Sequence, residues 1–401
     1  MNLLLKTILL LIITSAGFAQ DTVIQNKIKY YNNKVEKYLD KEKALLGYYY
    51  SIDKSGIKIF ASSKDKLNNK AEFKVSWDSI DLSNRTSNKI KNDAVKKLSG
   101  YKIAIDAGHT AGDIAGGKLE QKHLKFNINT TEGKRDSIEI AEGMLTFATA
   151  KLLKEKLEAE GAEVFMTRKF NGATAFGVAF ENWLRINYKN AVDSLYRIGE
   201  ITEQRKQWLL TKATKRDKFK MVFKDIELQK RGEIINNYQP DFTVIIHYNV
   251  DETNLGWAKP TNKDFDMTFV SGAFMKNDLS TKEKRLEFLR ILISNDLEKS
   301  ITLSSEVIKS FEKTLSVKTA TSADAKYLYQ SCLSTNEKGV YCRNLQLTRF
   351  IHSPLVYGET LYQDNGNECV LLNNETDKTK NKRVQQVAEA YFQGVISYIN
   401  K

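Results

Sequence analysis

The chain opens with a short apolar run, residues 7–14, that follows one lysine. This run is too short to span a bilayer comfortably, and Gly17 and Ala19 after it have the small-x-small spacing of a signal-peptidase site. We expect residues 1–19 to be a cleaved signal peptide; the alternative is an uncleaved anchor. Export places the mature chain in the periplasm, in the cell envelope or outside the cell, and not as an integral membrane protein.

Next, the pattern of polar and apolar positions predicts a small α+β module. In residues 22–46, apolar side chains recur at loosely helical spacing. Two strands are expected around the turn at 53–56, and the alternation over 71–82 predicts a third. The polar stretch 83–92 is typical of a linker. Residues 20–99 are therefore expected to form an α+β module and linker, to which the sequence assigns no role.

From residue 101 onward, strand-like and helix-like segments alternate. This order predicts an α/β fold, with a mixed, mostly parallel sheet flanked by helices. The expected strands are 102–108, 162–168, 241–249, 267–274 and 354–359. The expected helices are 139–161, 228–238, 285–315 and 382–399.

The composition is that of a folded chain, and the charge distribution bears on which classes of partner the protein binds. With 41% hydrophobic and 10% aromatic residues, the 401-residue chain is not a disordered one and suffices for one large or two ordinary domains. A net charge of +13 would favour binding of a polyanion such as nucleic acid. However, the lysines are scattered along the chain, and the sequence contains no nucleic-acid-binding motif. We expect no nucleic acid; a generally lysine-rich composition or attraction to an anionic envelope polymer explains the charge.

Cysteine and histidine counts restrict the chemistry further. Three cysteines are too few for a disulfide framework or a four-cysteine zinc site. In an oxidising compartment Cys332 and Cys342 could pair, which leaves Cys369 over. Any catalytic or metal-binding histidine must be one of four residues: His109, His123, His247 and His352.

Residues with ligand chemistry stand at the carboxyl ends of predicted strands, where parallel sheets place their sites. His109, His247 and Glu359 all have this position, and Glu142 lies in the first turn of a predicted helix. A hydrolytic zinc site takes three histidine or carboxylate ligands and one water, so His109, Glu142 and His247 form a candidate set. Taken singly, each histidine could be a surface or capping residue, and Glu142 could favour its helix dipole.

Four sequence blocks, in order, resemble the zinc-dependent N-acetylmuramoyl-L-alanine amidases of peptidoglycan turnover. The first is IAIDAGHTAGD, around His109, which is similar to the family's I-D-P-G-H-G-G-x-D turn. Glu142 then precedes Thr167-Arg168 by the family's ligand-to-strand spacing. Two later blocks are LQKRGEIINNYQPDFTVIIHYN, which ends near His247, and SPLVYGETLYQDNGNE, which contains Glu359. The likeness spans residues 101–401.

The resemblance implies a catalytic domain at 100–401 with the zinc amidase, phosphorylase/hydrolase-like sheet. It implies one Zn²⁺ per chain on His109, Glu142 and His247, with Glu359 as the catalytic acid and base. The implied substrate is peptidoglycan, cut between N-acetylmuramic acid and the L-alanine of the stem peptide. A zinc peptidase or carboxypeptidase acting on stem peptides, and a non-catalytic cell-wall-binding protein, remain as alternatives.

Several positions depart from the family pattern. Ala107 replaces a proline and Thr110-Ala111 replace two glycines, which is expected to alter the turn that presents His109. Residues 361–364 replace G-F-L-S and are expected to reshape the wall after Glu359. Asp106 either supports a ligand or ends its strand. His123 and His352 lie outside the matched blocks and are expected to be solvated and structural, respectively.

Two segments are longer than the family pattern requires. A polar stretch at 116–137 is expected to rim the cleft. A larger insertion, about 171–224, has helical spacing over 181–223 and holds eleven Lys and Arg residues against five Asp and Glu. It is a candidate lid, a grip for anionic glycan or a contact for a regulatory envelope protein; the alternative is packing away from the site.

Overall fold

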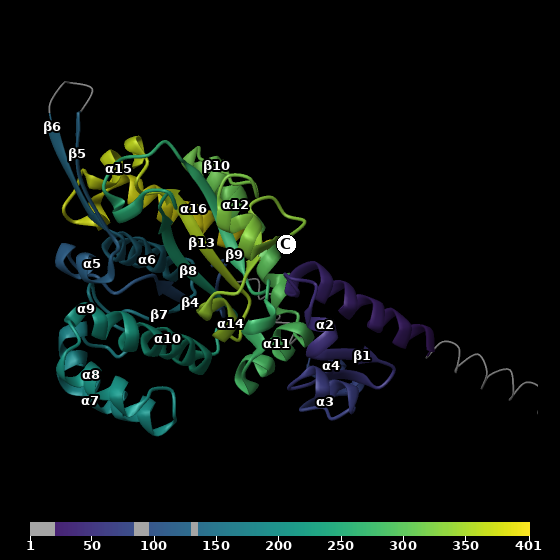
Figure 1. Ribbon diagram of the computed structural model, residues 1–401. Helices are drawn as coiled ribbons and strands as arrows, with labels where there is room; N and C mark the ends of the chain where they lie inside the picture. Colours follow the sequence, from purple (N-terminus) through teal and green to yellow (C-terminus); the bar gives the residue numbers. More distant parts are fainter. Residues whose placement is uncertain (1–20, 84–95, 130–134) are drawn as a thin grey trace, which may run out of the picture.

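The computed structural model describes residues 21–83, 96–129 and 135–401 (Figure 1). The expected signal peptide and all but the first residue of the expected linker lie outside the described residues. None of the helices in the described part of the chain combines the length and the hydropathy needed to cross a membrane.

A mixed, mostly parallel sheet lies at the centre, as expected. Its strand order is β11-β12-β9-β13-β8-β4-β7, and β10 pairs with β9. The neighbours β13, β8, β4 and β7 run parallel, whereas β13–β9 and β11–β12 are antiparallel pairs. The strands are β4 (Lys102–Ala107), β7 (Glu163–Met166), β8 (Phe242–Asn249), β9 (Phe265–Val270), β10 (Lys318–Thr319), β11 (Cys332–Ser334), β12 (Val340–Arg343) and β13 (Leu355–Tyr362).

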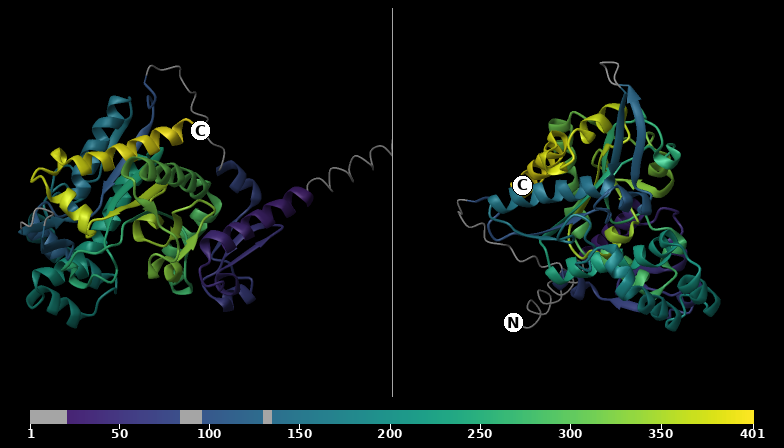
Figure 2. Two further views of the ribbon diagram at one scale, coloured as in Figure 1. Left: turned by 90° about the horizontal axis from the view of Figure 1, so that it is seen from above. Right: turned by 90° about the vertical axis from the view of Figure 1, so that its left-hand side faces the viewer.

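Helices cover both faces of the sheet (Figures 1 and 2). One face is covered by α6 (Glu142–Ala159), α12 (Asp296–Leu315) and α16 (Lys382–Ile399). The opposite face is covered by α10 (Lys224–Tyr238) and α14 (Gln346–Phe350). Because successive strand residues point to opposite faces, Ile246 packs under the first group and Ile245 under the second.

Two of the expected helices differ from the observed ones by a change of backbone conformation, and α10 begins four residues before the expected 228. The pattern at 285–315 forms two helices, α11 (Lys282–Ile293) and α12, because Ser294 between them has extended backbone with ψ of 159°. The helix expected from 139 starts only at Glu142, since the residues before it form β6 (Arg135–Ala141). Both differences arise because apolar spacing alone does not reveal a change of backbone conformation.

The described residues of the polar stretch at 116–137 lie mostly in regular elements. It contributes α5 (Ile114–Glu120) and β5 (His123–Asn129), which pairs with β6 in an antiparallel hairpin. The described part of this hairpin projects from the molecule at the upper left of Figure 1. Only the first part of the stretch therefore lies near the carboxyl end of β4.

The N-terminal module contains a helix and a small antiparallel sheet. Residues 21–34 are helical and continue into η1 (Val35–Leu39). The expected hairpin and its third strand form the sheet, with α2 (Leu45–Tyr48) and α3 (Ser63–Leu67) beside it; its strands are β1 (Tyr50–Asp53), β2 (Gly56–Ile59) and β3 (Phe73–Val75).

The strand expected over 71–82 is wrong beyond Val75. Residues from Trp77 onward form α4 (Trp77–Ser83). The hydroxyl oxygen of Ser76 accepts a hydrogen bond from the Ser79 N–H at 3.3 Å, which caps this helix. The serine cap outweighs the alternation of polar and apolar residues.

From Phe180 onward, the insertion at 171–224 is mostly helical, as the spacing predicted. It contains α7 (Phe180–Arg197), α8 (Glu203–Thr211), α9 (Lys215–Lys218) and η2 (Phe219–Phe223), which continues directly into α10. Trp183, Val192, Leu209 and Phe223 belong to a buried cluster that is separate from the main core. The insertion therefore forms a small lobe on the α10 side of the sheet (Figure 1).

All three cysteines are free and buried, so the suggested pairing of Cys332 with Cys342 is wrong in this structure. Cys342 lies opposite Leu333 in the β11–β12 pair, one position out of register with Cys332. Adjacent register positions point to opposite faces, and accordingly the two thiols belong to different buried clusters.

Candidate active site

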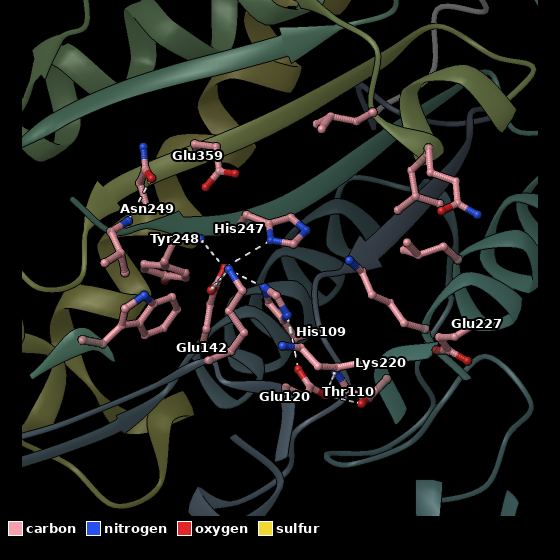
Figure 3. Close-up of a pocket in the computed structure, with 18 of the residues that line it drawn as sticks. His109, Thr110, Glu120, Glu142, Lys220, Glu227, His247, Tyr248, Asn249 and Glu359 are labelled. Atoms are coloured by element: carbon pink, nitrogen blue, oxygen red, sulfur yellow. Dashed lines mark hydrogen bonds and ion pairs between the residues drawn. The ribbon is translucent and has the colours of Figure 1, made fainter. Parts of the chain in front are cut away.

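Three side chains from separate elements converge at the carboxyl end of β4 and β8 (Figure 3). His109 follows β4, Glu142 begins α6 and His247 lies in β8. Glu142 Oε1 lies 3.0 Å from His109 Nε2 and 3.1 Å from His247 Nδ1. The side chains are 16%, 2% and 12% exposed, in the order His109, Glu142, His247. The structure thus brings together the set that sequence spacing proposed.

Two buried arginines hold the turn that presents His109. This residue has a φ of +62°, a conformation that favours glycine, so the turn needs support from its surroundings. Arg231 donates to the His109 carbonyl oxygen at 2.5 Å, and Arg168 donates to the Gly108 carbonyl oxygen at 3.1 Å. Both guanidinium groups bind backbone carbonyl oxygens of the turn. They thereby fix the backbone position from which the His109 side chain projects.

Asp106 supports this turn through Arg231. Its carboxylate accepts from Arg231 Nη1 at 3.1 Å and from the Thr167 hydroxyl at 2.5 Å. Arg231 also pairs with Glu227 at 3.1 Å, so the buried guanidinium is flanked by two carboxylates. Of the two expected roles of Asp106, the structure therefore favours support of the ligand turn.

Gly108 permits the close approach of the two histidines. A Cβ atom at this position would lie 2.4 Å from His247 Cε1 and 2.7 Å from the Ile246 carbonyl oxygen. Any side chain here would displace the His247 ring. The His109 and His247 ring centroids consequently lie 4.9 Å apart.

Glu142 is held in the ionised form. Its Oε1 also accepts the Tyr248 N–H at 3.2 Å, and Lys122 Nζ lies 3.8 Å from Oε2. Burial alone would raise the pKa of Glu142, but the charges of His109 and Lys122 and the close contacts with both histidines hold that pKa well below its usual range. Burial lowers the pKa of His247, which favours a neutral imidazole.

Strand register places Glu359 beside His247. The two residues are paired across β13 and β8, and both point to the face covered by α10 and α14. The ring of Tyr357 stacks on His247 with centroids 4.6 Å apart and an interplanar angle of 5°. Burial, reinforced by the charge of Glu142, raises the pKa of Glu359 to about 7. A carboxyl group with that pKa can take up and release a proton near neutral pH.

The donor set fits a zinc ion. Two imidazoles and one carboxylate are the ligands of a hydrolytic zinc site that leaves a position open for water. Among the described residues, the buried atoms His109 Nε2 and Glu142 Oε2 have no hydrogen-bond partner. One donor atom from each of the three residues lies within 4.8 Å of the others, which suits a shared cation.

A cleft of about 660 Å³ opens from these residues. On one side Glu359 and Tyr357 line it, and on another Lys122 lies 4.9 Å from the Trp257 ring centroid. The end of the insertion forms the opposite wall through Phe219, Lys220, Phe223 and Lys224. The alternative that the whole insertion packs away from the site is therefore wrong for η2, while α7 and α8 contribute no lining residue.

The two histidines outside the matched blocks do not line the cleft. His352 is 45% exposed and lies 3.2 Å from Glu287, outside the cleft. His123 lies in β5 and is likewise absent from the cleft lining. After Glu359, Leu361 has a φ of +56° and the strand register shifts between Thr360 and Tyr362, but residues 361–364 are absent from the cleft lining, and the expected reshaping of the wall stays a prediction.

Sequence reasoning missed two side chains that contact the ligand candidates. Glu120 Oε2 lies 3.2 Å from His109 Nδ1, and Lys122 approaches Glu142. Both belong to the polar stretch that we expected only to rim the cleft. Their spacing from His109 matches no motif, and the available signal was a carboxylate shortly after a histidine turn.

The chain matches a known protein family over most of its length. The sequence model of the N-acetylmuramoyl-L-alanine amidase family matches residues 103–397. Among curated proteins, no relative matches the chain significantly.

Two solved structures are similar to this chain. The CwlD amidase of Clostridioides difficile, solved in complex with the GerS lipoprotein, has 16% identity and a TM-score of 0.40, with 75% of this chain and 99% of that chain covered. The catalytic domain of the amidase CwlV from Bacillus (Paenibacillus) polymyxa var. colistinus has 14% identity and a TM-score of 0.38, covering 75% and 98%. On the strength of the family match over most of its length, the chain belongs to the N-acetylmuramoyl-L-alanine amidase family.

Proposed function

We propose that this protein is an exported, zinc-dependent N-acetylmuramoyl-L-alanine amidase of peptidoglycan. The observation that carries the proposal is the meeting of His109, Glu142 and His247 at one point, with Glu359 beside His247 across the sheet. Binding alone would not call for both a metal-ligand set and an adjacent carboxyl group of raised pKa. Family membership supports the same chemistry.

The three ligand candidates and Glu359 have separate tasks in this proposal. A zinc ion on His109, Glu142 and His247 would supply an acidified water and would polarise the scissile carbonyl. The Glu359 carboxylate takes a proton from the attacking water. It then gives this proton to the nitrogen of L-alanine, which leaves poorly while unprotonated. The products are a muramic acid carboxylate and a stem peptide with a free amino terminus.

The walls of the cleft suit a glycan-linked peptide with carboxylate groups. Lys220 and Lys224 line it from the end of the insertion, and Lys122 lines it beside Glu142. Two of the acidic lining residues are paired: Glu227 with Arg231, and Asp251 with Lys263 at 3.2 Å. The wall that carries Lys220 and Lys224 is therefore positively charged. We propose that η2 grips the substrate and that α7 and α8 are the part of the insertion accessible to a regulatory envelope protein.

Muropeptide analysis tests the proposed activity. Purified sacculi are incubated with the zinc-loaded protein, and the soluble products are separated and identified by mass spectrometry. We expect peptides with a free amino-terminal L-alanine and glycan strands that lack them. Cleavage inside the stem peptide would instead identify a peptidase or carboxypeptidase, and tight sacculus binding without products would identify a wall-binding protein.

Metal analysis and intact mass test the other parts of the proposal. We expect about one zinc per chain for a mononuclear site of this type. Export with signal cleavage predicts a mature chain that starts at Gln20, which the mass of protein purified from its natural cells reports. A full-length mass, or protein confined to the cytoplasmic fraction, would contradict export without bearing on the chemistry.

A further inference from the structure

Glu120 occupies a position that metal-ligand spacing does not explain. It is the last residue of α5, and its side chain is only 4% exposed. Asp113 caps the start of this short helix by accepting the Gly116 N–H at 2.7 Å. At the other end, Gln121 adopts the left-handed conformation and ends the helix. Both ends of α5 are thus fixed, and Glu120 is directed at the turn that presents His109 (Figure 3).

The Glu120 carboxylate binds both residues of that turn. Its Oε2 lies 3.2 Å from His109 Nδ1, while its Oε1 accepts the Thr110 N–H at 2.8 Å and also the Thr110 hydroxyl. Thr110 stands where the family pattern has a glycine. The hydroxyl that this departure introduces is therefore used to hold Glu120 in place.

With a metal bound between Nε2 and Glu142, these contacts would leave a single tautomer for His109. An ionised carboxylate can only accept hydrogen bonds, so His109 Nδ1 must carry the proton that faces Glu120. The lone pair of a neutral imidazole then lies on Nε2, the atom 3.0 Å from Glu142 Oε1. Nε2 is buried and faces Glu142, the second ligand candidate, without a well-formed hydrogen bond, so a metal between the two atoms could take both as ligands.

We propose that Glu120 is a positioning residue that fixes the tautomer and direction of the His109 ring for metal binding. The inference rests on the proposed metal site, because it concerns one ligand of that site. The insertion supports the same position: Lys220 contacts the Gln121 side chain, and Arg216 donates to the Lys118 carbonyl oxygen at 3.4 Å. The helix α5 therefore connects the insertion lobe to His109.

Zinc affinity of Glu120→Gln provides the test. One glutamine oxygen can still accept the Thr110 N–H, but the amide NH₂ then faces His109 Nδ1 and favours the tautomer that cannot bind metal through Nε2. Zinc is removed and titrated back against a competing chelator. We expect the dissociation constant to rise 10- to 100-fold, as for other carboxylates that orient a metal-bound histidine. The melting temperature of the metal-free variant should stay close to that of the wild type.

Glu139→Gln is the matched control, since Glu139 is 36% exposed, lies nearby in β6 and pairs with Lys125 at 3.2 Å. It should leave zinc affinity unchanged. Equal zinc affinity of Glu120→Gln and the wild type would overturn the proposal. A wild type that binds no zinc would instead refute the proposed function, which keeps the two failures distinct.

Nuclear magnetic resonance of the wild type gives a second readout that does not depend on a variant folding. Selective ¹⁵N labelling of histidine yields only four side chains, and a His109→Gln variant assigns the signal of interest. In the zinc-loaded protein we expect a proton on His109 Nδ1 and none on Nε2. A proton on Nε2 would contradict the proposal.

Discussion

At the scale of single residues, the site contains two buried carboxyl groups in opposite environments. Glu142 lies between two histidines and near Lys122, which lowers its pKa, whereas burial and the charge of Glu142 raise the pKa of Glu359 to about 7. Environments that separate the pKa values of neighbouring acids also separate their roles. Glu142 is suited to remain an ionised ligand and Glu359 to transfer protons.

Glu359→Gln should keep zinc and lose turnover. The amide retains the shape of the side chain but cannot accept the proton of the attacking water, and acid–base groups of this kind contribute roughly 10²- to 10⁴-fold. We expect a rate loss in that range for release of L-alanine amino termini from sacculi, with about one zinc per chain still bound. An unchanged rate would show that another group is the base.

Asp266 should make the protein less stable as the pH rises. This carboxyl group in β9 is fully buried, and burial, with the charge of Glu312, raises its pKa from 3.8 to about 8. A raised folded-state pKa stabilises the protein below pH 4, and this stabilisation is lost as the pH rises towards 8. The free energy of unfolding should therefore fall by roughly 3 kcal/mol between pH 5 and pH 8 on account of this group.

Asp266→Asn removes the titration and should flatten this dependence, which urea unfolding at the two pH values measures. The exposed Asp225→Asn is the control and should leave the slope as in the wild type. An equally steep fall in Asp266→Asn would show that other groups cause it.

At the scale of elements, the insertion divides into two parts with different surroundings. The helices α7 and α8 enclose their own apolar cluster with η2, around Trp183 and Phe223. Because η2 continues without a break into α10, it is fixed to the helix that carries Arg231. The part that lines the cleft is therefore a fixed wall of the site, whereas α7, α8 and α9 contribute no residue to the cleft lining.

Removing the charges of this wall should weaken substrate use. Lys220→Ala with Lys224→Ala leaves the cleft with less positive charge, and exposed charges of this kind contribute up to about 1 kcal/mol each. We expect kcat/KM on sacculi to fall three- to tenfold, mainly through KM, and the difference from the wild type to shrink in high salt. Lys212→Ala at the exposed end of α8 is the control. Equal values for all three proteins would show that the wall does not contact substrate.

At the scale of the whole molecule, the N-terminal module shares one core with the catalytic fold. Leu39 and Tyr50 belong to the same buried cluster as Phe274 and Phe288, and the Tyr50 and Phe288 ring centroids lie 6.0 Å apart. Arg285 of α11 also pairs with Glu72 of the module at 2.7 Å. The module is therefore part of the folded unit, and its deletion would expose apolar surface of the catalytic fold.

Leu39→Ala should destabilise the entire chain and not the module alone. Truncation of a completely buried leucine costs about 2 to 5 kcal/mol. We expect one thermal unfolding transition, shifted to lower temperature, by calorimetry and by loss of activity alike. The exposed Leu67→Ala is the control. A separate early transition that leaves activity intact would show that the module unfolds independently.

The amino-acid sequence predicted much of the fold and the main site residues. Its alternation of elements indicated the sheet and helices, and the blocks around His109 and His247 indicated where ligands would lie. The sequence pattern predicted wrong bounds where a single residue changes the backbone conformation against the apolar periodicity. Ser76 caps a helix where the third strand was expected to continue after Val75, and Ser294 divides one expected helix into two.

What the sequence by itself determined is the set of elements and the chemistry at their ends, because periodicity and residue type are local properties. Only the tertiary structure decided which residues from distant parts of the sequence contact the side chains at the ends of those elements. Glu120 meets His109, Arg231 meets Asp106, and η2 forms a wall of the cleft, through contacts that depend on how α5, α10 and the insertion pack. Such contacts arise from the summed packing of the whole chain, and no spacing along the sequence encodes them.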